Sequence, residues 1–101
     1  NGHIAFNEPG TPRDSLTRKV KLTQNTIQYN SRFFGDDVNE VPTHAYTMGI
    51  ESIMRAKQIY LLANGKHKKD ILEKACYGDI TSDIPASYLQ EHKAVDVLYC
   101  D

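Results

Sequence analysis

The stretch that decides the fold is residues 59–78, IYLLANGKHKKDILEKACYG. It begins with the continuous apolar run Ile59–Ala63, which is typical of a strand covered on both faces in a parallel sheet. The pair Asn64-Gly65 predicts a tight turn. Residues 66–77 then place apolar side chains at helical spacing, and Gly78 ends the helix. A strand, a turn and a helix in this order form the repeating unit of an α/β fold.

The rest of the chain continues this alternation in both directions. Residues 15–22 alternate as in a half-exposed strand, and Thr23 is placed to cap a short helix that runs to Phe34. We expect a brief strand, a helix, a short helix and a final strand at residues 44–47, 49–57, 87–92 and 94–100. This order predicts an α/β sandwich with a mostly parallel sheet.

Length and composition narrow the class of protein. The 101 residues are enough for one domain and not for two. With 12 Lys+Arg against 13 Asp+Glu, the chain lacks the basic excess of a nucleic-acid binder. No apolar run approaches the roughly 18 residues of a membrane span, and the first residues lack the pattern of a signal peptide. We therefore expect a cytoplasmic protein with neither nucleic-acid nor membrane partners.

The cysteines and histidines indicate no metal site. Cys76 and Cys100 belong to no metal-binding spacing, and the four histidines form no ligand array. We expect both cysteines to be small buried hydrophobic residues.

The residues that open the helix after the turn favour an anion site. Lys66, His67, Lys68 and Lys69 stand where positive charge opposes the helix dipole. A helix start that departs this far from the preferred charge pattern suggests a functional site. Free backbone N–H groups and an ammonium group at the carboxyl end of a strand would suit a phosphate or a carboxylate. The alternative is that these side chains simply point into solvent.

A second candidate is the loop at residues 3–9, which contains His3 and Glu8. A nearby carboxylate holds a histidine in one tautomer and suits it to general acid–base catalysis, although such pairs in surface loops are often without function. Arg32 stands beside two phenylalanines, where it either lies over an apolar surface or grips a phosphate. Arg18 interrupts the apolar side of its strand, so it either reaches the surface or binds a charged group.

Several short motifs follow one another along the chain. They are Asn1–Gly10, Asn30–Phe34, Asp37–Asn39 with Val41-Pro42, Ala45–Ile50, Gly65–Lys68, and Leu89-Gln90 with His92. In this order they resemble the glucosamine-6-phosphate deaminases, also called glucosamine-6-phosphate isomerases. The resemblance covers essentially all 101 residues. It identifies residues 1–101 as the C-terminal part of a single glucosamine-6-phosphate isomerase/6-phosphogluconolactonase-like domain.

The resemblance implies a fold and a reaction. The fold is a Rossmann-like, three-layer α/β sandwich, present here as a C-terminal fragment. The reaction converts glucosamine 6-phosphate and water to fructose 6-phosphate and ammonia by ring opening, aldose–ketose isomerisation and deamination. No metal, nucleotide or other cofactor is implied. Hexamers and monomers both occur among similar proteins, so a homo-oligomer is possible and the resemblance does not decide the oligomeric state.

The resemblance also assigns roles to residues. His3 would open the sugar ring as a general acid and base, with Glu8 and Asn1 in the same charge-relay group. Arg32 and Lys68 would contact the substrate phosphate, which agrees with the anion site argued above.

Three departures from the family accompany these roles. Well-known members have Asp in place of Asn1, so we expect a lower pKa for His3. Arg18 resembles the first residue of an allosteric pair, but Val20 stands at the second. The family's phosphate loop and enolising Asp lie in an N-terminal half outside these residues, so we expect the 101-residue chain alone to be inactive.

Two alternatives to the deaminase remain. One is a 6-phosphogluconolactonase-like hydrolase, in which the motif after the histidine usually continues Thr-Ala-Ser-Leu, so Glu8 disfavours it. The other is a non-catalytic module that binds sugar phosphates for regulation.

Overall fold

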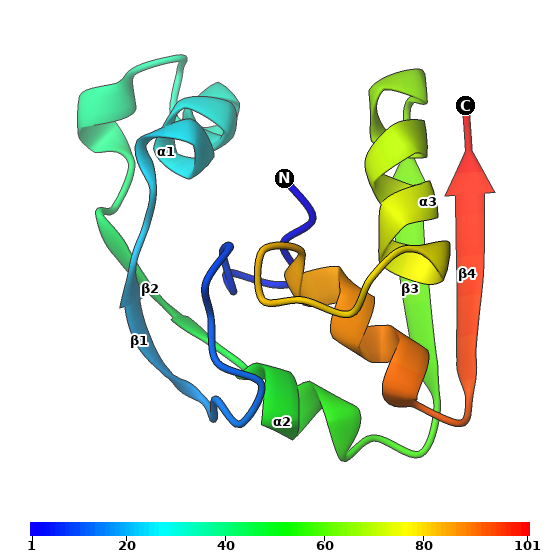
Figure 1. The fold of residues 1–101 in the computed structure, drawn as a ribbon. Helices are drawn as coiled ribbons and strands as arrows, with labels where there is room; N and C mark the ends of the chain where they lie inside the picture. The colour runs from blue at the N-terminus through cyan, green and yellow to red at the C-terminus, as the bar shows by residue number, and fades with distance from the viewer.

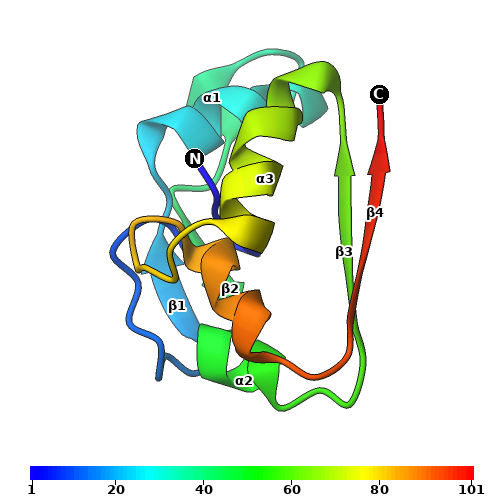
Figure 2. The ribbon, with the colours of Figure 1, turned by 45° about the vertical axis from the view of Figure 1, so that its right-hand side comes forward.

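A parallel strand pair forms one side of the molecule. The computed structural model describes all residues, Asn1–Asp101. In it, β3 (Ile59–Asn64) and β4 (Val95–Cys100) pair in parallel with unbroken register. Helix α3 (Lys69–Tyr77) covers one face of the pair (Figure 2). The predicted α/β class and the parallel pairing are confirmed.

The core lies between this strand pair and the segments in front of it. Ile59 and Leu61 point toward a buried cluster, whose members come from the N-terminal loop, α2, α3 and the segment before β4. The buried residues of the cluster are Ile4, Ile50, Ala75, Ala86 and Leu89. On the other face, Tyr60 is 64% exposed and Leu62 is 72% exposed. The strand expected to be covered on both faces is thus covered on one face in this chain.

The other two strands do not join the parallel pair. Strands β1 (Arg18–Lys21) and β2 (His44–Thr47) form a separate antiparallel ribbon on the opposite side of the molecule (Figure 1). The expected strand at 15–22 is shorter at both ends. Ser15 lies outside it, because its hydroxyl and its carbonyl accept the backbone N–H groups of Ile50 and Glu51. Ser15 therefore holds the start of helix α2 (Ile50–Met54).

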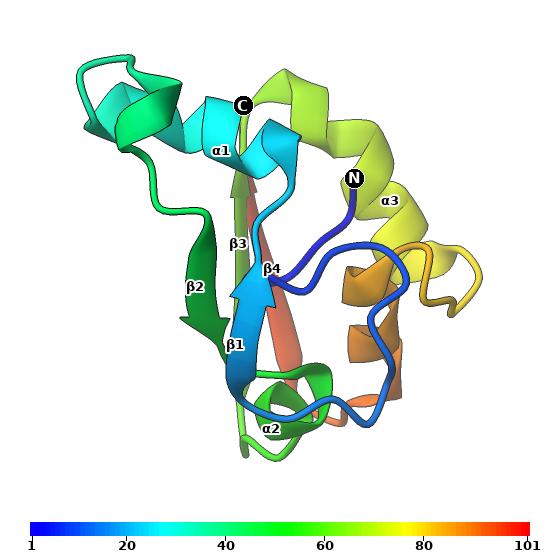
Figure 3. The same cartoon turned by 90° about the vertical axis from the view of Figure 1, so that its left-hand side faces the viewer.

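A short helix closes the end of this ribbon. Thr23 is the N-cap of α1 (Gln24–Asn30), and its hydroxyl accepts the Thr26 N–H at 3.2 Å, as the sequence predicted. The helix ends before Phe34 and tightens into a 3₁₀ turn at Ser31–Phe33. Figure 3 shows α1 across the end of the ribbon.

The remaining elements refine the expected boundaries. Residues 66–68 form a 3₁₀ turn before α3, and Gly78 ends that helix as predicted. Further 3₁₀ segments run over Val38–Glu40 and, before β4, over Pro85–Glu91. No helix has the length and apolar character that crossing a membrane requires.

One prediction about the cysteines is wrong. Both thiols are free, but Cys100 is exposed and Cys76 is only half-buried. Cys100 is the last residue of β4 and lies two residues after Leu98, which is 51% exposed, so both side chains are on the face of the strand pair that the helices leave uncovered.

Candidate active site

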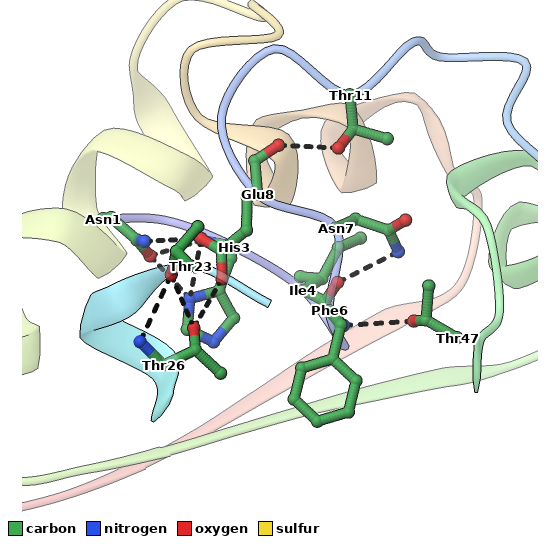
Figure 4. Close-up of polar contacts among 10 residues, drawn as sticks. All are labelled: Asn1, His3, Ile4, Phe6, Asn7, Glu8, Thr11, Thr23, Thr26 and Thr47. Atoms are coloured by element: carbon green, nitrogen blue, oxygen red, sulfur yellow. Dashed lines mark hydrogen bonds and ion pairs between the residues drawn. The ribbon is translucent and has the colours of Figure 1, made fainter. Parts of the chain in front are cut away.

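The loop that carries the histidine is fixed to β2. Residues Ile4 and Asn7 form an isolated β-bridge, and the side chain of Asn7 is fully buried. Its amide donates to the Ile4 carbonyl at 3.0 Å and to the Met48 carbonyl at 2.7 Å. The Phe6 N–H donates to Thr47 Oγ1 at 3.1 Å (Figure 4). The side chains of Asn7 and Thr47 thus hold the loop at the end of β2.

Asn1, His3 and Glu8 meet in one hydrogen-bonded series (Figure 4). Asn1 Nδ2 donates to Glu8 Oε2 at 2.7 Å, and Asn1 Oδ1 lies 2.6 Å from His3 Nδ1. An ionised carboxylate only accepts, so it fixes the orientation of the Asn1 amide. The amide oxygen also only accepts, so His3 Nδ1 carries the proton. The lone pair of neutral His3 is therefore on Nε2.

Thr26 extends this series and was not foreseen in the sequence. Its hydroxyl donates to the second carboxylate oxygen, Glu8 Oε1, at 2.8 Å, and it accepts from the hydroxyl of Thr23 at 3.0 Å. A threonine inside a helix, 18 positions from Glu8, carries no pattern that marks it. Through Thr26 the carboxylate is bonded on both oxygens, and α1 is tied to the loop.

The electrostatic surroundings favour a neutral His3. Burial lowers the pKa of His3 below its ordinary value of 6.5, the Glu8 carboxylate works in the opposite direction, and the Lys68 ammonium lowers it further. The direction agrees with the prediction made from Asn1, but the main cause is burial. The side chain is still 38% exposed, so the imidazole stays accessible to a ligand.

Lys68 lies across a cavity from this loop. The cavity has a volume of about 440 Å³ and is lined by Asn1, His3, Phe6, Asn25, Thr26, Tyr29, Asn30 and Lys68. A second, smaller cavity of about 200 Å³ adjoins it between the loop and β3, and it shares Asn1, His3 and Lys68. The structure therefore brings His3 and the predicted phosphate-binding lysine to one opening.

Arg32 is placed differently from Lys68. It does not line the cavity; its guanidinium lies over the ring of Tyr29, at 4.0 Å from the centroid, and near that of Phe33, at 4.6 Å. Neither Arg32 nor Lys68 takes part in any of the four ion pairs of the chain. By contrast, Arg13 is paired with two glutamates. Two cations near the cavity are thus without a carboxylate partner.

Arg18 binds no charged group of this chain. Its guanidinium is half-buried and donates to neutral oxygens, Asn7 Oδ1 at 3.0 Å and the Leu16 carbonyl at 3.1 Å. It supports the loop through Asn7 and does not line the cavity. No three His, Cys, Asp or Glu side chains converge in an arrangement that would hold a metal ion.

Comparison with known proteins places this chain in a family. Residues 12–98 match the family described as glucosamine-6-phosphate isomerases/6-phosphogluconolactonase. Glucosamine-6-phosphate deaminase from Lachnoclostridium phytofermentans is 55% identical over 100 residues, which is 99% of this chain and 42% of that protein. The deaminase from Lactobacillus johnsonii is 56% identical over 101 residues, which is 100% of this chain and 41% of that protein.

A solved structure gives the same result. A monomeric glucosamine-6-phosphate deaminase matches with a TM-score of 0.93 and 46% identity over 99% of this chain and 41% of that one. The chain therefore spans about two fifths of the length of the relatives that it matches.

Proposed function

Because the chain belongs to the family of glucosamine-6-phosphate isomerases and 6-phosphogluconolactonase, we propose that the protein that carries it is a glucosamine-6-phosphate deaminase. The enzyme would be a hydrolase of amino-sugar catabolism that forms fructose 6-phosphate and ammonia from glucosamine 6-phosphate and water. The observation that carries the proposal is the series Glu8–Asn1–His3, which stands beside the unpaired Lys68.

His3 would act first, in opening the sugar ring. Ring opening moves a proton from the anomeric hydroxyl to the ring oxygen. Neutral His3 would accept that proton at Nε2 and return it to the ring oxygen. While His3 is charged, the Glu8 carboxylate stabilises it through the Asn1 amide. The C2 proton then passes to C1 and an N–H proton to O1, which leaves an imine at C2. Water adds to that carbon and ammonia leaves, so C2 becomes the ketone carbon of fructose 6-phosphate.

Lys68 and Arg32 would hold the substrate phosphate. Charge-assisted hydrogen bonds to phosphate are shorter and stronger than neutral ones, and arginine adds a two-pronged geometry. Arg18 is proposed as a regulatory contact, since its guanidinium holds the buried Asn7 in the loop that carries His3.

The proposal is tested by assaying the full protein that carries these residues. Incubation with glucosamine 6-phosphate is expected to release ammonia and fructose 6-phosphate in equal amounts. Hydrolysis of 6-phosphogluconolactone without ammonia release would instead support the hydrolase alternative. Sugar-phosphate binding with neither reaction would support the regulatory module.

We also propose that residues 1–101 alone lack this activity. No acidic side chain lines either cavity and could take the C2 proton. Glu8 lies behind Asn1 and His3, and both of its carboxylate oxygens are already bonded, to Asn1 and to Thr26. Ammonia release by the isolated segment at the rate of the full protein would overturn this.

Two further predictions concern the protein in the cell. A cytoplasmic location agrees with the two free thiols, since disulfides are rare in that compartment; localisation of the tagged full protein tests it. A homo-oligomer stays a prediction, which the mass of the full protein in solution decides.

A further inference from the structure

The partners of Arg32 distinguish it from the other arginines of the chain. Its guanidinium carbon lies 4.0 Å from the ring centroid of Tyr29 and 4.6 Å from that of Phe33. The sequence places Phe33 and Phe34 beside it, but the structure exchanges Phe34 for Tyr29, one helical turn earlier on α1. The cation–π contact with Tyr29 therefore depends on the helical turn, whereas the contact with Phe33 joins neighbours in the chain.

This stacking leaves the hydrogen-bonding groups of Arg32 free. Aromatic rings cover the face of a guanidinium, whereas its N–H groups point outward in the plane and match two phosphate oxygens. No carboxylate forms an ion pair with Arg32. The aromatic rings thus orient the guanidinium through its face, while its N–H groups stay available to an anion.

Tyr29 connects this stack to the cavity. Its ring lines the cavity together with His3 and Lys68, although Arg32 itself does not. The guanidinium is therefore one aromatic ring away from the opening where the phosphate is expected. Without this ring, Arg32 would lose more side-chain conformational entropy when the ligand binds.

We propose that Tyr29 is a positioning residue, whose ring orients Arg32 for a phosphate ligand at the cavity shared by His3 and Lys68. This inference rests on the proposed function in one respect, the assignment of Arg32 to the substrate phosphate. Phe33 supports the same guanidinium from a longer distance. Tyr29 itself makes no direct contact with the phosphate in this proposal.

The test measures inorganic phosphate binding by calorimetry, and kcat and KM, in the full protein. Tyr29→Ala is expected to weaken phosphate binding and to raise KM by about three- to tenfold, the range of a cation–π contact, with a smaller change in kcat. Tyr29→Phe keeps the ring and is expected to restore binding to within about twofold of the parent. Tyr46→Ala is the matched control, because Tyr46 is 78% exposed on β2 and lines neither cavity.

A double variant isolates the coupling. In an Arg32→Ala background, Tyr29→Ala is expected to cause no further loss of phosphate affinity. An equal loss with and without Arg32 would overturn the proposal, and so would a Tyr29→Phe protein as weak as Tyr29→Ala. Melting temperatures confirm that each variant is folded. If the parent protein binds phosphate with this pattern but releases no ammonia, the proposed function fails and the positioning role stands.

Discussion

The two sides of the cavity satisfy their polar groups in opposite ways. On the loop side, Asn1 is hydrogen-bonded to both His3 and Glu8, and the Thr26 hydroxyl donates to the second carboxylate oxygen of Glu8. On the facing side, Lys68 has no ion-pair partner. A group that transfers a proton needs a fixed orientation and tautomer, whereas a group that binds an external anion must keep its donors free. We infer that the loop side serves proton transfer and that the facing side serves anion binding.

Replacing the histidine is expected to have the largest effect and to fall on turnover. His3→Gln removes the acid and base at Nε2, so kcat is expected to fall by about 10² to 10⁴, with little change in KM. Steady-state kinetics of the full protein measure both values. His44→Gln, on an exposed histidine of β2, is the control. A rise in KM at unchanged kcat would show that His3 only binds.

The lysine is expected to give the opposite pattern. Lys68→Met keeps the length of the side chain and removes its charge. A lost hydrogen bond to a charged group, about 1.5–3 kcal/mol, predicts a KM about 10- to 100-fold higher and a smaller change in kcat. Lys69→Met, on the exposed next residue, should behave as the parent. A fall in kcat at unchanged KM would contradict the assignment of Lys68 to anion binding.

Thr26 tests how far the loop side depends on α1. Thr26→Val removes the hydroxyl that donates to Glu8 Oε1 at 2.8 Å while keeping the shape of the side chain. We expect kcat to fall by about three- to tenfold, the value of one hydrogen bond to a charged group or less. Thr26→Ser should recover most of the loss. Thr17→Val, on an exposed threonine, controls for the change in polarity, and equal losses in the serine and valine variants would exclude a role for the hydroxyl.

The smallest expected effect is a shift in the pH dependence of the reaction. The pKa of His3 is lowered, so the neutral form needed at Nε2 dominates at neutral pH, and kcat/KM is expected to fall only as pH drops below about 6.5. Asn1→Asp adds a negative charge at the atom that lies 2.6 Å from His3 Nδ1, which favours the imidazolium and raises that pKa. The acid limb of the kcat/KM profile should move to higher pH. Asn39→Asp adds the same charge on a remote 3₁₀ turn and should leave the limb in place.

The sequence predicted the parts of the fold that depend on local pattern. The bounds of β2, the Thr23 cap and the Gly78 helix end follow from turn and capping residues. The antiparallel pairing of β1 with β2 could not be predicted, because half-exposed strands of four residues carry no information about their partner. The exposure of Cys100 follows from its place on the face of the strand pair that no helix of this chain covers, which the local sequence pattern does not show.

The candidate site also has a part that the sequence predicts and a part that only the fold shows. Asn1, His3 and Glu8 lie within eight residues of one loop, so the sequence alone brought them together. Thr26 and Tyr29 reach the cavity only because α1 folds back over that loop. Helical spacing brings Tyr29 close to Arg32, but the sequence alone does not show whether Arg32 stacks on Tyr29 or on the nearby Phe34.

The separate tasks of the two sides are tested most directly by inorganic phosphate binding in two variants of the full protein. Calorimetry on His3→Gln is expected to give a dissociation constant within about twofold of the parent, and on Lys68→Met one about tenfold or more weaker. Equal weakening in both variants, or weakening in His3→Gln alone, would contradict the account.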